Sequence, residues 1–210
     1  MKREYRFLTQ ELRAAGTESQ PRIEGYAARY NVKTTLQPGV NEVIRPGAFR
    51  NTVARQDACY CCFNHNEERI ISRVSAGTLR LREDDLGLHF DSDIDLSVSY
   101  AADLYRNIRN GNVSECSFGF RMVKESYVDD VEEKDAVLRE LLEVSCFDVS
   151  PVIEPAYGNG VTSVSARSLF PDGTPSSVEL RGKRVAPAVE IDEHNELAQM
   201  RARIEIAKRR

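Results

Sequence analysis

One strand of this chain reads Ser114-Glu115-Cys116-Ser117-Phe118-Gly119-Phe120, and it alternates large apolar residues with small ones. Because successive side chains of a strand point to opposite faces, Phe118 and Phe120 share one face, and Ser117 and Gly119 share the other. The apolar face is expected to hold the strand against a core. The opposite face presents a serine hydroxyl beside a glycine, which allows a substrate backbone to come close.

The segments around this strand predict a mostly β domain with one well-defined helix. Residues 97–110 carry apolar side chains at helical spacing, with Ser97 or Ser99 to cap the start and Gly111 to end the helix. Strands are expected at residues 4–8, 22–30, 57–63, 113–123 and 137–149, a hairpin at 78–82 with 87–91, and connections at 11–21, 31–39 and 127–135.

The composition fits one soluble globular domain with additional segments, because 41% of the 210 residues are hydrophobic and 30% are charged. The net charge of −4 gives no global basic field, so nucleic acid is not expected as a partner. No apolar run approaches the roughly 20 residues of a membrane span. The N-terminus lacks the apolar core of a signal peptide. The chain is therefore expected to stay in the compartment where it is made.

The character of the chain changes after about residue 165. Residues 1–165 are predicted to form the domain, and residues 166–187, rich in Pro, Ser and Gly, to form a linker. Residues 188–210 are helix-prone. Their apolar side chains form one narrow stripe among charges, made up of Leu197, Met200, Ile204 and Ala207. This tail is either a partner-binding helix or a frayed amphipathic end, and the pattern favours neither.

The cysteines near His65 suggest two kinds of chemistry. The chain has five Cys, and an odd number without an export signal favours reduced thiols over disulfides. Cys59, Cys61 and Cys62 precede His65 at spacings that suggest zinc. Structural zinc sites use two separated pairs of ligands, however, and no second pair exists here. We therefore expect no metal, and interpret these cysteines as small apolar residues of a strand.

His65 is the histidine with the strongest case for catalysis. It lies at the end of a predicted strand between Asn64 and Asn66, whereas His89 alternates within a hairpin and His194 lies in the charged tail. A serine hydroxyl needs an imidazole to accept its proton and a third group to orient the imidazole. Two carboxylates on residues 137–149, Glu143 and Asp148, are candidates for that third group. They lie on opposite faces of the strand, so only one of them can serve.

Short motifs along residues 20–160 together resemble one protein family. In order they are Gly25-Tyr26-Ala27-Ala28-Arg29-Tyr30-Asn31, Glu42-Val43-Ile44-Arg45-Pro46-Gly47-Ala48-Phe49, Asn64-His65-Asn66, Gly77-Thr78-Leu79-Arg80-Leu81 with Gly87-Leu88, Ser117-Phe118-Gly119-Phe120, and Leu142-Glu143-Val144-Ser145 leading into Pro155-Ala156-Tyr157. Each motif is short, but their ordered combination resembles the prohead (capsid-maturation) serine proteases of tailed bacteriophages, distant relatives of the herpesvirus assemblins.

The resemblance implies a fold and a set of catalytic residues. The fold would be α+β and mostly β, an antiparallel β-barrel of the assemblin type surrounded by helices. Ser117 would be the nucleophile and His65 the general base. In the herpesvirus relatives the third member is another His, and this chain has none in that region. Glu143 lies near the position that the family pattern expects, so it is preferred, with Asp148 in reserve and Glu140 third.

The herpesvirus enzymes also use an arginine pair near the oxyanion, and no adjacent arginines occur between residues 144 and 166. Backbone N–H groups near residues 117–119, or a bound water, are expected to stabilise the oxyanion instead.

The resemblance further implies a biological role. The substrates would be the scaffolding segment of the major capsid protein, or a separate scaffold protein, and the protease itself. Cleavage would take place inside the procapsid in the cytoplasm of the bacterial host, without a cofactor, nucleic acid or membrane. Self-cleavage is expected in residues 166–187, where the backbone is accessible. A homodimer is also considered, because dimerisation matters in the herpesvirus relatives. The alternative is a catalytically inactive component that assists procapsid assembly.

Overall fold

A computed structural model describes residues 3–8, 12–55 and 58–153 of the chain. The predicted linker (166–187) and helical tail (188–210) lie outside the described residues. The elements are β1 (Arg3–Leu8), β2 (Leu12–Gly16), β3 (Pro21–Arg29), β4 (Thr34–Gln37), β5 (Val40–Ile44), α1 (Arg50–Ala54), β6 (Tyr60–Cys62), β7 (Ile70–Arg73), a 3₁₀ turn (Val74–Ala76), β8 (Leu79–Glu83), β9 (Gly87–Asp93), α2 (Ser99–Arg109), β10 (Glu115–Asp129) and β11 (Val137–Val152).

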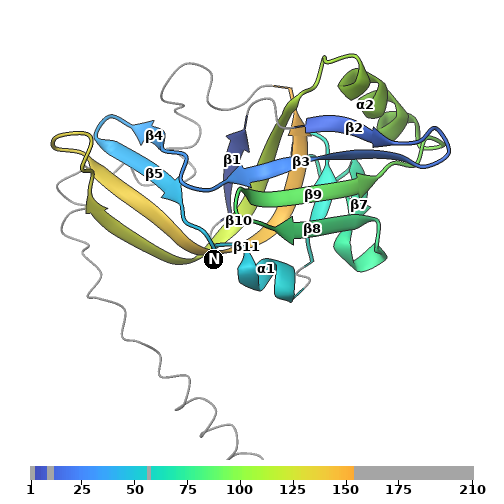
Figure 1. Ribbon diagram of the computed structural model, residues 1–210. Helices are drawn as coiled ribbons and strands as arrows, with labels where there is room; N and C mark the ends of the chain where they lie inside the picture. Colours follow the sequence, from blue (N-terminus) through green and yellow to red (C-terminus); the bar gives the residue numbers. More distant parts are fainter. Residues whose placement is uncertain (1–2, 9–11, 56–57, 154–210) are drawn as a thin grey trace, which may run out of the picture.

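The strands form two sheets, as Figure 1 shows. The first has the order β1-β10-β11-β5-β4, and β6 pairs with both β11 and β7. The second has the order β2-β3-β9-β8. The prediction of a mostly β protein is confirmed. The helices of the described residues are limited to α1, α2 and the short 3₁₀ turn.

The expected closed barrel is wrong for the part of the chain that the structure describes. β1 pairs with residues 116–121 at one end of the long β10–β11 hairpin. β5 pairs with residues 137–141, which lie opposite residues 125–129 at the other end of the hairpin. The flanking strands are thus staggered along the hairpin, and the terminal strands β1 and β4 do not meet. A barrel requires such strands to pair and close the sheet.

Local predictions were right where the periodicity was strong. The helix, the β8–β9 hairpin and strands β1, β3, β6, β10 and β11 are confirmed. The loops predicted at 11–21 and 31–39 are wrong in part, because they contain β2 and β4, and the connection predicted at 127–135 is wrong over its first three residues, which belong to β10. The predicted serine cap is also wrong: Val98 precedes the helix without a side-chain cap, and the Ser97 hydroxyl donates to Asp95 instead.

The core lies where the alternation of β10 predicts it. Cys116, Phe118 and Phe120 are buried on the same face of β10 and pack in one hydrophobic cluster with Phe49 and Phe90. Phe118 stacks on Phe120 with ring centroids 5.2 Å apart. The opposite face of β10 is thereby left for Ser117 and Gly119.

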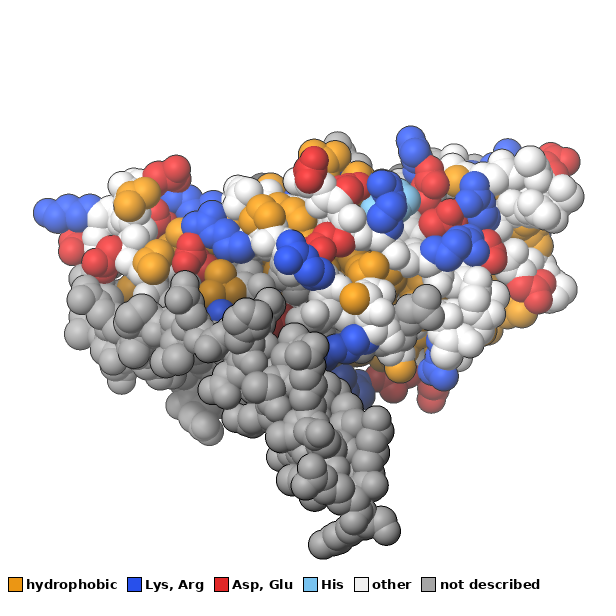
Figure 2. All heavy atoms as spheres, turned by 60° about the horizontal axis from the view of Figure 1, so that its bottom comes forward, with side chains coloured by type: hydrophobic (Ala, Val, Ile, Leu, Met, Phe, Trp, Pro, Cys, Tyr) orange, Lys and Arg blue, Asp and Glu red, His pale blue; other side chains and the backbone are white. Residues whose placement is uncertain are grey.

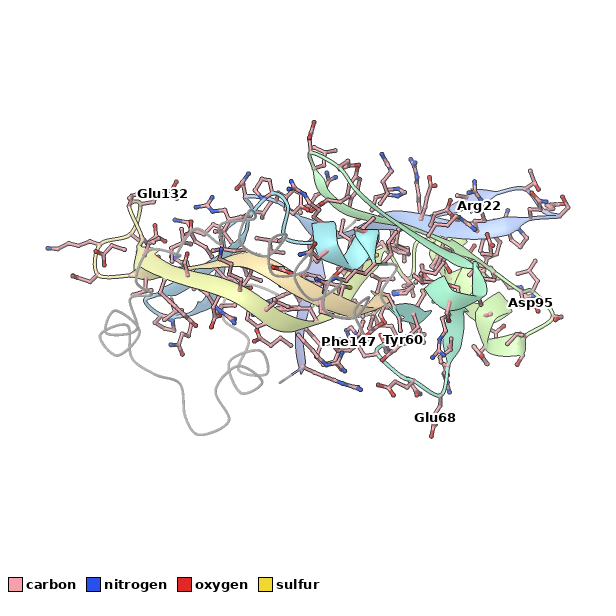
Figure 3. All side chains as sticks on the ribbon, turned by 90° about the horizontal axis from the view of Figure 1, so that it is seen from below. Arg22, Tyr60, Glu68, Asp95, Glu132 and Phe147 are labelled. Carbon is pink, nitrogen blue, oxygen red and sulfur yellow. The ribbon has the colours of Figure 1, made fainter. Side chains whose placement is uncertain are left out.

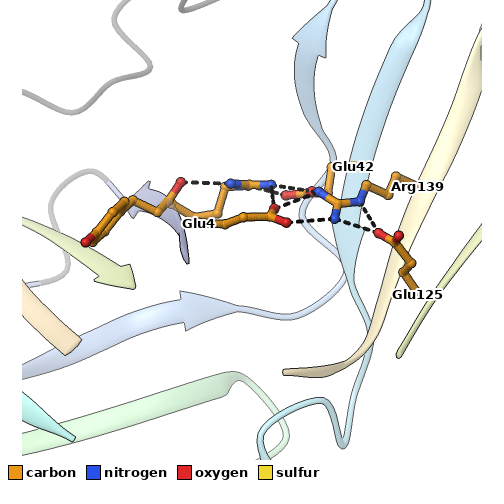
Figure 4. Close-up of polar contacts among 6 residues, drawn as sticks. Glu4, Glu42, Glu125 and Arg139 are labelled. Atoms are coloured by element: carbon orange, nitrogen blue, oxygen red, sulfur yellow. Dashed lines mark hydrogen bonds and ion pairs between the residues drawn. The ribbon is translucent and has the colours of Figure 1, made fainter. Parts of the chain in front are cut away.

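A buried network of charges fastens β1 to the rest of the first sheet (Figure 4). Arg139 donates to Glu4 and to Glu42, each at 2.9 Å, and to Glu125 at 2.6 Å. Arg6 donates to Glu4 at 3.0 Å and to Glu42 at 2.7 Å. Burial raises the pKa of Glu4, but the two guanidinium groups outweigh it and hold that pKa below its ordinary value.

The outer surface is mixed in charge. Figure 2 shows Lys or Arg and Asp or Glu side chains intermixed over the face that it draws. On the second sheet, Arg80 contacts both Asp91 and Asp93 in this way. Such exposed pairs contribute little to stability. Among the described residues no helix has the length and apolar character needed to cross a membrane.

Candidate active site

A tight turn at the end of β6 carries His65. The Asn66 N–H donates to the Phe63 carbonyl at 3.0 Å, and Asn64 and His65 have φ values of 52° and 57°. Positive φ at both central residues is the requirement of a type I′ turn, and Asn tolerates it better than most residues. Such strained backbone is typical of functional sites when neighbouring groups hold it in place.

Asn64 fastens this turn to the end of β11. Its backbone N–H donates to the Pro151 carbonyl at 3.0 Å, and its side-chain oxygen accepts from the Ile153 N–H at 3.1 Å. Asn64 therefore has a structural role. It fixes the position of the imidazole relative to β11.

The β10–β11 pairing brings a serine and an aspartate to one face of the sheet. Ser117 pairs with Ser150, and Gly119 pairs with Asp148. Cross-strand partners share a face, so all four side-chain positions lie on the side opposite Phe118. β6 joins β11 in parallel at Asp148 and Val149, which brings the His65 turn to the same place.

His65 contacts both partners through its two ring nitrogens. His65 Nε2 lies 2.5 Å from Ser117 Oγ, and His65 Nδ1 contacts Asp148 Oδ2. An ionised carboxylate only accepts hydrogen bonds, so Nδ1 carries the proton and Nε2 is free to accept the serine proton. The three groups have the relative positions of a nucleophile, a base and an orienting acid.

The second carboxylate oxygen of Asp148 is held as well. The Ser150 hydroxyl donates to Asp148 Oδ1 at 2.6 Å, and the Cys62 thiol approaches the same oxygen at 3.6 Å. Asp148 is almost completely buried, so these donors compensate for the lost hydration of the carboxylate. They also fix its orientation toward His65.

The structure does not bring Glu143 to His65, and the preference for Glu143 over Asp148 is corrected accordingly. Glu143 lies five residues before Asp148 on β11, roughly 16 Å away at about 3.3 Å per residue. Its carboxylate accepts a hydrogen bond from Asn51 on α1 at 2.6 Å. Glu140 is further away still, and it is paired with Arg45. The reason is the position at which β6 joins β11, which is adjacent to Asp148.

The cysteines are packing residues. Cys59, Cys61, Cys62 and Cys116 are fully buried. Burial, reinforced by the nearby Asp148 charge, raises the pKa of the Cys62 thiol to about 12. A thiol with such a pKa stays protonated near neutral pH, which suits neither a nucleophile nor a metal ligand. The described part of the chain contains no group of three potential metal-ligating side chains placed together.

The space beside Ser117 is filled by aromatic rings, not left open for a substrate backbone. A Cβ atom on Gly119 would lie 2.8 Å from the Tyr5 ring and 2.9 Å from the Phe147 ring. The Tyr5 ring in turn packs on His65, with centroids 4.4 Å apart. Gly119 therefore allows Tyr5 of β1 to support the imidazole. The expectation of close substrate approach at this glycine is corrected.

Two residues that support this site were not singled out in the sequence, Tyr5 and Ser150. Ser150 carried a usable signal, because it follows Asp148 by two positions and therefore shares its strand face. Tyr5 carried none, since only the β1–β10 pairing brings it to Gly119.

Access to the serine is restricted. Ser117 is 0% exposed, whereas the His65 side chain is 17% exposed. A peptide carbonyl can reach Ser117 Oγ only after the groups that cover it move. The backbone N–H groups expected to stabilise an oxyanion also belong to paired strands. At Ser117, β10 is paired on both sides, with Phe7 and with Ser150, so its amides are directed into the two strand ladders.

Comparison with known proteins gives one match. A family model described as caudovirus prohead serine protease matches residues 8–171. This span includes His65, Ser117 and Asp148. No curated protein and no solved structure matches the chain.

Proposed function

The chain belongs to the caudovirus prohead serine protease family, and on this premise we propose that it is a serine endopeptidase with Ser117 as nucleophile. His65 is the general base, and Asp148 orients it. The observation that carries this proposal is the continuous line of contacts from Ser117 Oγ through both nitrogens of His65 to Asp148.

In the proposed reaction, His65 Nε2 takes the Ser117 proton as Oγ attacks the carbonyl carbon of a peptide bond. The imidazolium that forms is stabilised by the Asp148 carboxylate. His65 then gives the proton to the departing amine, which leaves an ester on Ser117. A water molecule attacks this ester by the same proton transfers and restores the serine. The scheme uses neither a metal ion nor an organic cofactor.

The proposed substrates are those of head maturation. They are the scaffolding segment of the major capsid protein or a separate scaffold protein, and the protease itself, inside the procapsid in the host cytoplasm. Self-cleavage within residues 166–187 remains part of the proposal, as does a homodimer. We also keep a distant kinship with the herpesvirus assemblins as a proposal. In this chain an aspartate would take the place of their third catalytic residue.

The test is co-expression with the capsid protein of the same phage, followed by mass spectrometry of the products. Wild type and Ser126→Ala are expected to give the same processed fragments, because Ser126 lies far along β10 and bonds to Glu140. Ser117→Ala is expected to leave the capsid protein intact. Processing by Ser117→Ala would refute the nucleophile. Intact capsid protein with the wild type would favour the inactive assembly component.

A further inference from the structure

A row of aromatic rings leads away from His65 on the face of the sheet that carries Ser117. Tyr5 packs on His65, and the Phe147 ring lies 5.8 Å from the Tyr5 ring, centroid to centroid. The Tyr60 ring follows at 6.5 Å from Phe147. Figure 3 labels Tyr60 and Phe147 side by side, next to the loop that carries Glu68. Phe147 reaches this face because it is the extra residue of a β-bulge between Cys146 and Asp148.

Three guanidinium groups surround the far end of this row. The Cζ atoms of Arg3 and Arg121 each lie 4.9 Å from the Phe147 centroid, and that of Arg73 lies 6.0 Å from the Tyr60 centroid. Arg3 and Arg121 are direct cross-strand partners on β1 and β10. Like charges at such positions oppose each other, so their pairing destabilises the sheet unless a negative group lies nearby.

Most of these guanidinium groups have no carboxylate partner in the described part of the chain. Glu67 accepts from Arg3 at 2.6 Å and from the Tyr60 hydroxyl at 2.9 Å. Within the described residues, the guanidinium groups of Arg73 and Arg121 have neither an ion pair nor a hydrogen bond. Of these three guanidinium groups, only that of Arg3 has a carboxylate partner among the described residues. Arg121 is also half-buried against an aromatic ring, where its charge is screened less than in open solvent.

The position of Arg121 relative to Ser117 fits an extended peptide. Arg121 lies four residues beyond Ser117 on the same strand face, roughly 13 Å away at about 3.3 Å per residue. A peptide in extended conformation has the same rise. Its side chain near Arg121 would therefore belong to a residue roughly three to five positions from the scissile bond.

We propose that Arg121, assisted by Arg73 and Arg3, forms a specificity subsite for an acidic side chain of the substrate peptide. The proposal rests on the proposed protease function. The rings of Tyr5 and Phe147 form the floor between this subsite and the catalytic serine. The chemistry recognised is a carboxylate, which a guanidinium binds through paired N–H donors. Arg121 is a specificity-determining residue and takes no part in bond breaking.

The experiment uses synthetic peptides that span a mapped cleavage site of the capsid protein. Glu and Gln are placed in turn at positions two to six residues on either side of the scissile bond. At one position the wild type is expected to cleave the Glu peptide with a kcat/KM roughly three- to thirty-fold above that of the Gln peptide. Most of this difference should come from a lower KM for the Glu peptide. Arg121→Gln should bring this ratio to about one. Arg109→Gln is the matched control, because Arg109 also lies over an aromatic ring, Tyr105, but on α2.

Equilibrium binding separates this proposal from the protease function. The same peptides are titrated into full-length Ser117→Ala, with and without Arg121→Gln. Tighter binding of the Glu peptide that disappears with Arg121→Gln supports the subsite, even if the wild type cleaves nothing. A Glu-to-Gln ratio near one at every position, or a ratio that Arg121→Gln does not change, overturns the subsite, even if cleavage by Ser117 is normal.

Discussion

Asp148→Asn is expected to disable the enzyme through the tautomer of His65. Asp148 Oδ1 accepts hydrogen bonds from the Ser150 hydroxyl at 2.6 Å and the Cys62 thiol at 3.6 Å. Its other oxygen, Oδ2, contacts His65 Nδ1. An asparagine that keeps its oxygen toward these two donors turns its NH₂ group toward Nδ1. Nδ1 must then be the acceptor, so the proton moves to Nε2. In that tautomer His65 cannot accept the Ser117 proton.

The size of the effect follows from these contacts. The opposite amide orientation would leave the Ser150 hydroxyl and the Cys62 thiol without their acceptor, at a cost of about 1 kcal/mol each, so the unproductive orientation dominates by roughly thirtyfold. Loss of the negative charge also removes stabilisation of the imidazolium. Replacing the aspartate by asparagine in an established serine-protease triad lowers kcat by about 10⁴. We expect a loss of about 10³ to 10⁴ here, or roughly 4 to 5.5 kcal/mol.

The assay is peptide cleavage by four variants of equal thermal stability. Glu143→Gln should stay within about threefold of the wild type, because its carboxylate contacts Asn51 and not His65. Ser150→Ala alone should lower the rate by roughly tenfold, since a carboxylate loses a donor. Added to Asp148→Asn, the same change should raise the rate by about fivefold, because it releases the amide from its unproductive orientation.

The double variant tests whether the amide orientation at position 148 sets the tautomer of His65. A further loss when Ser150→Ala is added to Asp148→Asn would show that the tautomer argument is wrong. A crippled Glu143→Gln beside a normal Asp148→Asn would exclude Asp148 as the orienting group altogether.

Three further predictions concern the surroundings of the site. Arg139→Met should lower the free energy of unfolding by about 3–5 kcal/mol in urea titrations, against less than about 1 kcal/mol for the exposed control Arg13→Met. Because the folded-state pKa of Glu4 is lowered, the wild type should lose stability as the pH falls below the ordinary glutamate value, and Arg139→Met should show a weaker dependence, since Arg6 alone then lowers this pKa; an equal dependence in both would count against the network. Gly119→Ala should cost about 1–3 kcal/mol of stability and also reduce activity, because its Cβ displaces Tyr5 from His65; full activity would exclude that support. Iodoacetamide at pH 8 should modify Cys62 only in the unfolded protein, as mass spectrometry would show, because the thiol pKa is about 12; rapid labelling of the native protein would contradict its burial.

Much of the fold could be predicted because its signals are local. The alternation at residues 114–120 correctly assigned Phe118 to the core and Ser117 to the opposite face. The helical spacing within residues 97–110 correctly predicted α2. β2 was missed because Leu12-Arg13-Ala14-Ala15-Gly16 has little intrinsic strand preference, and it forms a strand through its pairing with β3.

The candidate site was also predicted only in part from the sequence. The residue types and their order drew attention to His65 and Ser117, and the structure brings these two within hydrogen-bond distance. The preferred carboxylate, Glu143, is not the one that contacts His65, because its distance along the chain from Ser117 carries no information about which part of β11 faces the His65 turn.

The sequence alone thus determined the β character, the two faces of β10 and a short list of candidate residues, since each depends on neighbours along the chain. The tertiary structure decided which carboxylate contacts His65 and which groups surround it. The parallel pairing of β6 with Asp148 and Val149 puts the His65 turn at Asp148, and the β1–β10 register puts Tyr5 over Gly119. Register between distant strands depends on the packing of the whole sheet, which no local pattern encodes.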